Sequence, residues 1–216
     1  MTTLRTAALA TVAMCFASVS HAGFITIDNV APAGSSTGVA ANNNFSAQLA
    51  SLGINTYATG LSLGTDTAGT VSFYYYGKEA GYSNTFSASG LSFSTGYASY
   101  VDNFGAPIAI GSLAVDAGLL SFGFCANSGG PVGCVTNAQN DALGMNSFQS
   151  IAINVSESTA WLFWDDSGAG PDDNHDDMLI KAVFRPTSVP EPMTAALLGV
   201  GLLGLGFSKR RKQIKS

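Results

Sequence analysis

The residues with the clearest chemical potential are clustered carboxylates in the last third of the chain. Six of the 13 acidic residues between positions 23 and 188 lie between Trp164 and Met178, in a segment without lysine or arginine. Carboxylates this close together repel one another unless a cation joins them, and oxygen ligands on a glycine-containing loop suit Ca²⁺. We therefore predict a calcium site whose expected ligands are Asp165, Asp166, Asp172, Asp173, Asn174, Asp176 and Asp177.

The spacing of these acidic residues is not that of an EF-hand, because no glycine stands at the sixth position and no glutamate closes the loop at the twelfth. The alternative to a calcium site is a solvated acidic hairpin tip in which Asp and Asn serve as turn residues. The sequence leaves both interpretations open. Catalysis by this segment is disfavoured, since His175 is the sole histidine after position 22.

Short strands separated by Gly, Asn and Ser clusters must position this segment. Apolar residues recur at every second position, most clearly at Ile151, Ile153 and Val155, as is typical of half-buried strands. Strands are predicted at residues 24–28, 70–76, 86–93, 108–113, 119–124, 150–155, 160–164 and 178–184, and one short helical turn at 47–53. We predict an all-β fold, an antiparallel β-sandwich with jelly-roll-like connections.

No catalytic group of residues stands out elsewhere. Glu79 and Glu157 are candidates for the paired carboxylates of a glycosidase, although Lys78 and Glu79 fit a simple surface ion pair. Trp161 and Trp164 offer faces on which sugars stack, but aromatic residues that alternate along strands more often belong to the core. We therefore expect a protein that is not an enzyme.

The first 22 residues have the layout of a secretory signal peptide. Arg5 precedes an apolar stretch at residues 7–19, and Ser20 and Ala22 place small residues at positions −3 and −1 of a cut before Gly23. Residues 1–22 are therefore expected to be removed on export.

Export bears on the two cysteines of the mature chain, Cys125 and Cys134, which bracket a turn that contains Gly and Pro. In an exported protein this spacing most simply predicts one local disulfide. A structural zinc site would need four ligands, and His175 is the single histidine available.

The charge of the region between residues 23 and 188 narrows the possible partners. Three basic residues stand against 13 acidic ones there, which gives a formal net charge of −10. A body this acidic repels phosphate backbones, so nucleic-acid binding is excluded.

The C-terminal residues form three parts in a fixed order. The first, Val189, Pro190, Glu191 and Pro192, should be extended and accessible, because proline fixes φ and disfavours helix in the residue before it. Residues 193–207 are apolar and predict a short transmembrane helix. The basic stop, Lys209, Arg210, Arg211 and Lys212, favours the cytoplasmic side and places the preceding residues outside.

This three-part tail resembles the PEP-CTERM protein-sorting signal of Gram-negative bacteria. The resemblance implies that an exosortase, a membrane transpeptidase-like protease, recognises and removes the tail. The inner membrane would then be a transient partner. A plain single-pass anchor is the simpler alternative.

Together these features predict a signal peptide at 1–22, an exported β-sandwich domain at 23–186 and a PEP-CTERM sorting signal at 187–216. The expected location is the cell surface or the extracellular matrix, with a structural or adhesive role in the exopolysaccharide or biofilm layer. Exopolysaccharide is the candidate partner. A calcium-dependent carbohydrate-binding module is the alternative function, and a secreted hydrolase is the third.

Overall fold

A computed structural model describes residues 22–28, 36–128, 133–139, 150–166 and 174–187. Residues 1–21 of the expected signal peptide, the whole three-part tail from residue 188, and the predicted ligands Asp172 and Asp173 lie outside the described residues. Among the residues that are described, no helix has the length and apolar character needed to cross a membrane.

The described chain is mostly β-structure, as the alternating pattern predicts. Its elements are β1 (Phe24–Asp28), β2 (Ser36–Gly38), α1 (Ser46–Ser51), β3 (Thr56–Ala58), β4 (Leu61–Thr65), β5 (Gly69–Glu79), β6 (Ser83–Ala88), β7 (Leu91–Ser94), β8 (Tyr100–Asp102), β9 (Ile108–Val115), β10 (Gly118–Leu119), β11 (Phe122–Ser128), β12 (Gly133–Thr136), the 3₁₀ turn η1 (Asn137–Gln139), β13 (Ser150–Ser156), β14 (Thr159–Asp165) and β15 (Met178–Pro186).

The strands form antiparallel sheets of eight, four and three strands. The main sheet has the order β2-β3-β13-β14-β15-β5-β8, with β9 also paired to β5. The second sheet has the order β12-β11-β6-β7, and the third the order β1-β4-β10. This unequal division differs from the two matched sheets of an eight-stranded jelly roll. The all-β, antiparallel class is confirmed.

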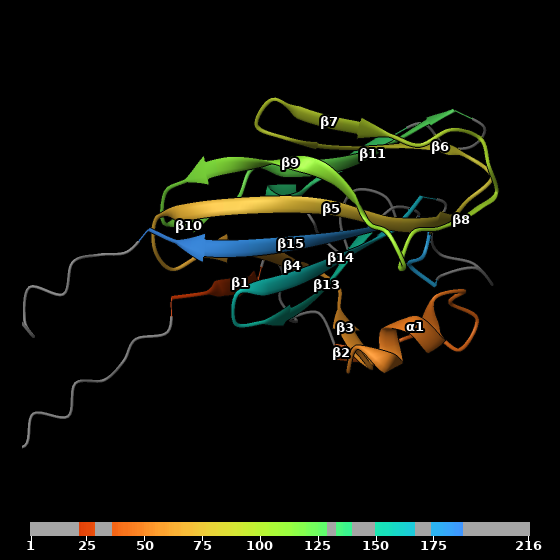
Figure 1. Ribbon diagram of the computed structural model, residues 1–216, viewed down its shortest axis with the longest axis horizontal. Helices are drawn as coiled ribbons and strands as arrows, with labels where there is room; N and C mark the ends of the chain where they lie inside the picture. Colours follow the sequence, from red (N-terminus) through yellow and green to blue (C-terminus); the bar gives the residue numbers. More distant parts are fainter. Residues whose placement is uncertain (1–21, 29–35, 129–132, 140–149, 167–173, 188–216) are drawn as a thin grey trace, which may run out of the picture.

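The main and second sheets face each other across one hydrophobic core (Figure 1). Ring contacts join the two sheets: the centroids of Phe73 and Phe86 lie 5.0 Å apart, and those of Phe124 and Trp164 lie 5.3 Å apart and nearly parallel. Each fully buried aromatic side chain contributes about 1.5–3 kcal/mol through removal of apolar surface from water. The sheets are therefore held together mainly by aromatic packing.

The outer face of the main sheet is covered in its turn by the segment around α1, which Figure 1 shows on the side away from β6 and β7. Phe45, Leu49 and Tyr57 form a second apolar cluster with Trp161 and Phe163 of β14. Because both of its faces are covered, β14 is buried at every position from Ala160 to Asp165. A continuous apolar run on this strand is the sequence counterpart of that burial.

Two of the predicted strands are each divided in the structure. The segment predicted as one strand at 86–93 forms β6 and β7, because Ser89 and Gly90 both adopt positive φ, 38° and 92°, in a two-residue hairpin turn. The segment predicted at 119–124 is shared by β10 and β11.

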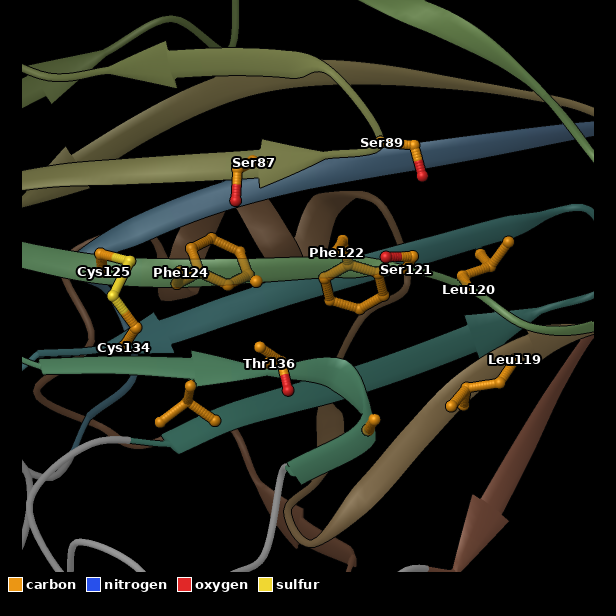
Figure 2. Close-up of a pocket in the computed structure, with 13 residues that line it drawn as sticks. Ser87, Ser89, Leu119, Leu120, Ser121, Phe122, Phe124, Cys125, Cys134 and Thr136 are labelled. Atoms are coloured by element: carbon orange, nitrogen blue, oxygen red, sulfur yellow. A yellow bond between two sulfur atoms is a disulfide. The ribbon is translucent and has the colours of Figure 1, made fainter.

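The disulfide predicted from the sequence is present. Cys125 of β11 and Cys134 of β12 lie directly opposite each other in the antiparallel pair, with their Cα atoms 4.0 Å apart and their sulfurs bonded (Figure 2). The bond closes the hairpin at the edge of the second sheet.

We expect replacement of both cysteines by serine to lower the free energy of unfolding by about 2–3 kcal/mol, since a loop this short restricts the unfolded chain only modestly. For a domain of this size the melting temperature should fall by roughly 2–4 °C per kcal/mol. Reduced wild-type protein serves as the control and should melt like the double variant. Efficient alkylation of both thiols in the folded, unreduced protein would contradict the bond.

Candidate functional site

The described members of the predicted calcium loop lie inside the protein rather than at a solvated tip. Asp165 ends β14 and Asp166 follows it, while Asp176 and Asp177 precede β15; all four are at most 6% exposed. Asn174 and His175 are also buried. The interpretation of this segment as a solvated acidic turn is therefore wrong for these six residues. They form, with Glu79, what we call the acidic cluster.

Backbone hydrogen bonds hold the two sides of the cluster together. The Asp177 amide donates to the carbonyl of Trp164 at 3.0 Å, which continues the β14–β15 pairing beyond Met178. In return, the Asp166 amide donates to Asp177 Oδ2 at 2.7 Å. The carboxylate of Asp177 is thus fixed against the end of β14.

The turn before α1 closes the cluster from the outer face of the main sheet. The amide of Asn44 donates to Asp176 Oδ2 at 2.7 Å, and Asn43 Nδ2 donates to the carbonyl of Asn174 at 2.9 Å. Asn43 is itself buried, and its Oδ1 accepts from the Phe45 amide. These contacts join residues more than 130 positions apart in the chain.

Glu79 reaches the cluster from the end of β5. Its amide donates to the carbonyl of Asp176 at 2.8 Å, and one carboxylate oxygen from each of Glu79, Asp176 and Asp177 lies within 4.8 Å of the others. An irregularity in the β5–β15 pairing just before this point, at Gly77, changes the alternation of β5. A Cβ on Gly77 would lie 2.6 Å from the carbonyl oxygen of Val101, so this close approach requires glycine.

Asn84 of β6 brings the second sheet to the same place. It is fully buried, and its Nδ2 donates to Asp166 Oδ2 at 2.6 Å and to the carbonyl of Asp177 at 3.2 Å. Its Oδ1 is buried and has no hydrogen-bond partner. The carboxamide therefore lies against the carboxylates with one acceptor unsatisfied.

Lys78 supplies positive charge beside the cluster. The side chain is fully buried, and Nζ donates to the carbonyls of Tyr82 at 2.6 Å and Gly96 at 2.9 Å. Burial lowers the pKa of Lys78, while the charges of Asp166, Asp177 and Glu79 act in the opposite direction. The surface ion pair expected for Lys78 and Glu79 is therefore wrong: Lys78 is an interior cation close to acidic groups.

Burial among the carboxylates also shifts the pKa of Asp177. Burial, followed by the neighbouring charge of Asp166, raises the pKa of Asp177 to about 9. Hydrogen bonding from the Asp166 amide opposes this rise but does not reverse it. The direction of this shift reflects several carboxylates that lie close together in a buried position.

The other candidates from the sequence are separated by the fold. Glu79 lies at the end of β5 beside Asp176, whereas Glu157 lies in the β13–β14 turn, next to Ser158, whose carbonyl accepts from the Phe184 amide near the end of β15. The two glutamates therefore stand at opposite ends of the main sheet. Trp161 and Trp164 are buried, at 4% and 0% exposure, so their faces serve packing rather than sugar stacking.

Residues 60–64 fit the G-x-S-x-G spacing of a nucleophile elbow, a match that sequence reasoning missed. Its Ser62 lies on strand β4, is fully buried and donates to the carbonyl of Asn137. A nucleophile elbow needs an exposed serine on a strand-to-helix turn. The motif match therefore does not mark a catalytic serine. A second match, at residues 34–38, falls partly outside the described residues.

A cavity of about 410 Å³ lies beside the disulfide (Figure 2). Hydroxyl groups of Ser87, Ser89, Ser121 and Thr136 line it together with apolar side chains such as Leu119. None of its lining residues is an acid, a base or a histidine. The cavity therefore lacks groups for acid–base chemistry, and the acidic cluster remains the chemically distinctive site.

Comparison with known proteins identifies a motif near the end of the chain. Residues 188–212 match the family model of the PEP-CTERM protein-sorting motif. The chain carries a PEP-CTERM protein-sorting motif. The motif marks it for export, exosortase processing and membrane-associated sorting to the cell surface. No curated protein and no solved structure matches the chain.

Sequence reasoning missed three residues of this site: Glu79, which belongs to the acidic cluster, and Lys78 and Asn84, which lie beside it. They precede the predicted loop by more than 80 positions and reach it through the β5–β15 pairing and the facing of the two sheets. A usable signal was Lys78, one of three basic residues in the body, which stands two positions after the predicted strand at 70–76. A charged residue continuing a strand with buried alternate positions is a candidate for a buried ion pair.

We expect Lys78→Met to destabilise the metal-free PEP-CTERM protein by about 3–5 kcal/mol, because removing one partner leaves buried carboxylates without their nearby cation. Lys181→Met is the matched control. Lys181 Nζ lies 5.5 Å from the Trp161 ring centroid on a partly exposed face, so its loss should cost about 0.5–1 kcal/mol. Urea denaturation with a chelator present measures both. Equal losses for the two variants would show that Lys78 does not compensate the cluster.

Proposed function

We propose that this PEP-CTERM protein is a non-enzymatic structural or adhesive component of the cell surface or extracellular matrix. The observation that carries the proposal is the sorting motif at residues 188–212, which follows directly after the end of β15 and Thr187. An exosortase acting there would release or transfer a body that ends in a hydrogen-bonded strand. The signal peptide at residues 1–22 would start its export.

The acidity of the body supports a role in the exopolysaccharide layer. Its formal net charge of −10 keeps copies apart and soluble at high density. The two candidate glycosidase carboxylates stand at opposite ends of the main sheet, which favours a structural role over hydrolysis. Exopolysaccharide is the partner we propose for this layer.

A calcium-dependent carbohydrate-binding module is the second candidate, and one observation favours it. Tyr97 and Tyr100 are 68% and 48% exposed, and Tyr100 lies opposite Glu79 in the β5–β8 pair. One of these exposed tyrosines, Tyr100, therefore stands next to the acidic cluster. Aromatic rings of this kind present an apolar face with a polar edge, which suits sugar rings.

The sorting part of the proposal is tested by Glu191→Ala in a host that carries the matching exosortase. We expect wild-type protein to leave the inner membrane without its basic C-terminal end, whereas the variant stays there uncleaved. Glu157→Ala, the same substitution outside the sorting motif, is the control and should be sorted normally. Intact-mass analysis that finds Lys209 and the residues after it on the released wild-type protein would contradict processing.

The two candidate functions are separated by binding of the exported protein to a glycan array, with calcium and with chelator. If the role is structural, we expect no calcium-dependent binding to particular glycans on the array. A calcium-dependent module predicts selective binding that chelator abolishes and that Tyr100→Ala weakens. Such binding would replace the structural assignment with the carbohydrate-binding one.

A further inference from the structure

The acidic cluster has the geometry of a cation site that differs from the ligand set expected from the sequence. Carboxylate oxygens of Glu79, Asp176 and Asp177 lie within 4.8 Å of one another. Two oxygens on opposite sides of a calcium ion lie about 4.6–5.2 Å apart, against about 4.0–4.2 Å for magnesium. The three oxygens therefore fit within a single calcium coordination sphere.

An independent observation points to a ligand at the same place. Asn84, from the other sheet, is fully buried, and its amide nitrogen is bonded to Asp166 Oδ2 and to the Asp177 carbonyl. Those two bonds hold the carboxamide against the cluster, while its Oδ1 accepts no hydrogen bond. A buried amide oxygen without a donor is unfavourable, and a neutral amide oxygen is a common calcium ligand.

The number of carboxylates around this position also favours the binding of a cation. Asp165, Asp166, Asp176 and Asp177 are buried, and Glu79 adds a fifth carboxylate. Lys78 offers one positive charge, and its Nζ is directed to the carbonyls of Tyr82 and Gly96. Carboxylate and amide oxygens without cysteine ligands favour calcium over zinc or copper.

We propose that Glu79, Asp176 and Asp177, assisted by Asn84, bind one calcium ion in the interior end of the sandwich. Asp166 then orients Asn84 through their hydrogen bond. The proposed ion joins β5 and the β14–β15 connection to β6 of the facing sheet. The ion would stabilise the contact between the two sheets. This role is independent of any ligand that the protein surface binds.

The full-length protein, freed of metal with chelator, is titrated with calcium chloride while heat and melting temperature are recorded. We expect one calcium per chain. Extracellular modules of this class bind at about 0.1–1 mM, so a tenfold excess over Kd should raise the melting temperature by about 3–6 °C. Magnesium at the same concentration should raise it far less, because its octahedral sphere is smaller.

Glu79→Gln keeps the size of the side chain and removes one ligand charge, so it should weaken calcium binding roughly tenfold or more. Asp177→Asn tests a second ligand should the first variant fold poorly. Asp116→Asn, an exposed aspartate between β9 and β10, is the matched control and should bind like wild type. The proposal is overturned if calcium leaves the wild-type melting temperature unchanged, if magnesium acts equally, or if both ligand variants keep wild-type affinity.

Discussion

Burial of like charges at one end of the two facing sheets is the constraint on which this structure depends. Moving a carboxylate out of water costs several kcal/mol unless hydrogen bonds and opposite charge offset it. Here the offsetting groups come from separate parts of the chain: the amide of Asn44 before α1, Asn84 of β6 and Lys78 of β5. The charges are thus compensated only when both sheets and the turn before α1 are in place. Burial of the cluster is therefore favourable only in the fully assembled sandwich.

The acidic cluster and the start of the sorting segment lie at opposite ends of the main sheet. Pro186 pairs with Gly69, and the Thr187 amide donates to the carbonyl of Ala68, whereas Leu179 pairs with Gly77 near the cluster. A strand rises about 3.3 Å per residue, so the two ends are separated by roughly 25–30 Å. In the proposed membrane-held form, the cluster would therefore lie at the end of the main sheet that is distant from Thr187.

Alternating apolar residues were enough to predict β5, β13 and β15, because the residues that face the core recur at every second position. A continuous apolar run predicted β14, which is covered on both faces. The short strands β2, β3 and β8 were missed, since three residues carry no measurable period. For the candidate site, the sequence indicated the acidic segment before β15 but not its burial. That burial depends on Lys78, Glu79 and Asn84, and no local pattern connects these residues to a loop more than 80 positions away.

The disulfide and the acidic cluster act on the same part of the second sheet. In the β6–β11 pair, Cys125 lies opposite Thr85 and Ala126 lies opposite Asn84, so the hairpin closed by the disulfide supports the strand that presents Asn84 to the cluster. Disulfides form in oxidising compartments, and weak calcium sites are filled outside the cell. The disulfide and the proposed calcium ion would therefore both be absent before export, when a less stable chain is easier to translocate. Both would be present after export, when they would stabilise the folded sandwich.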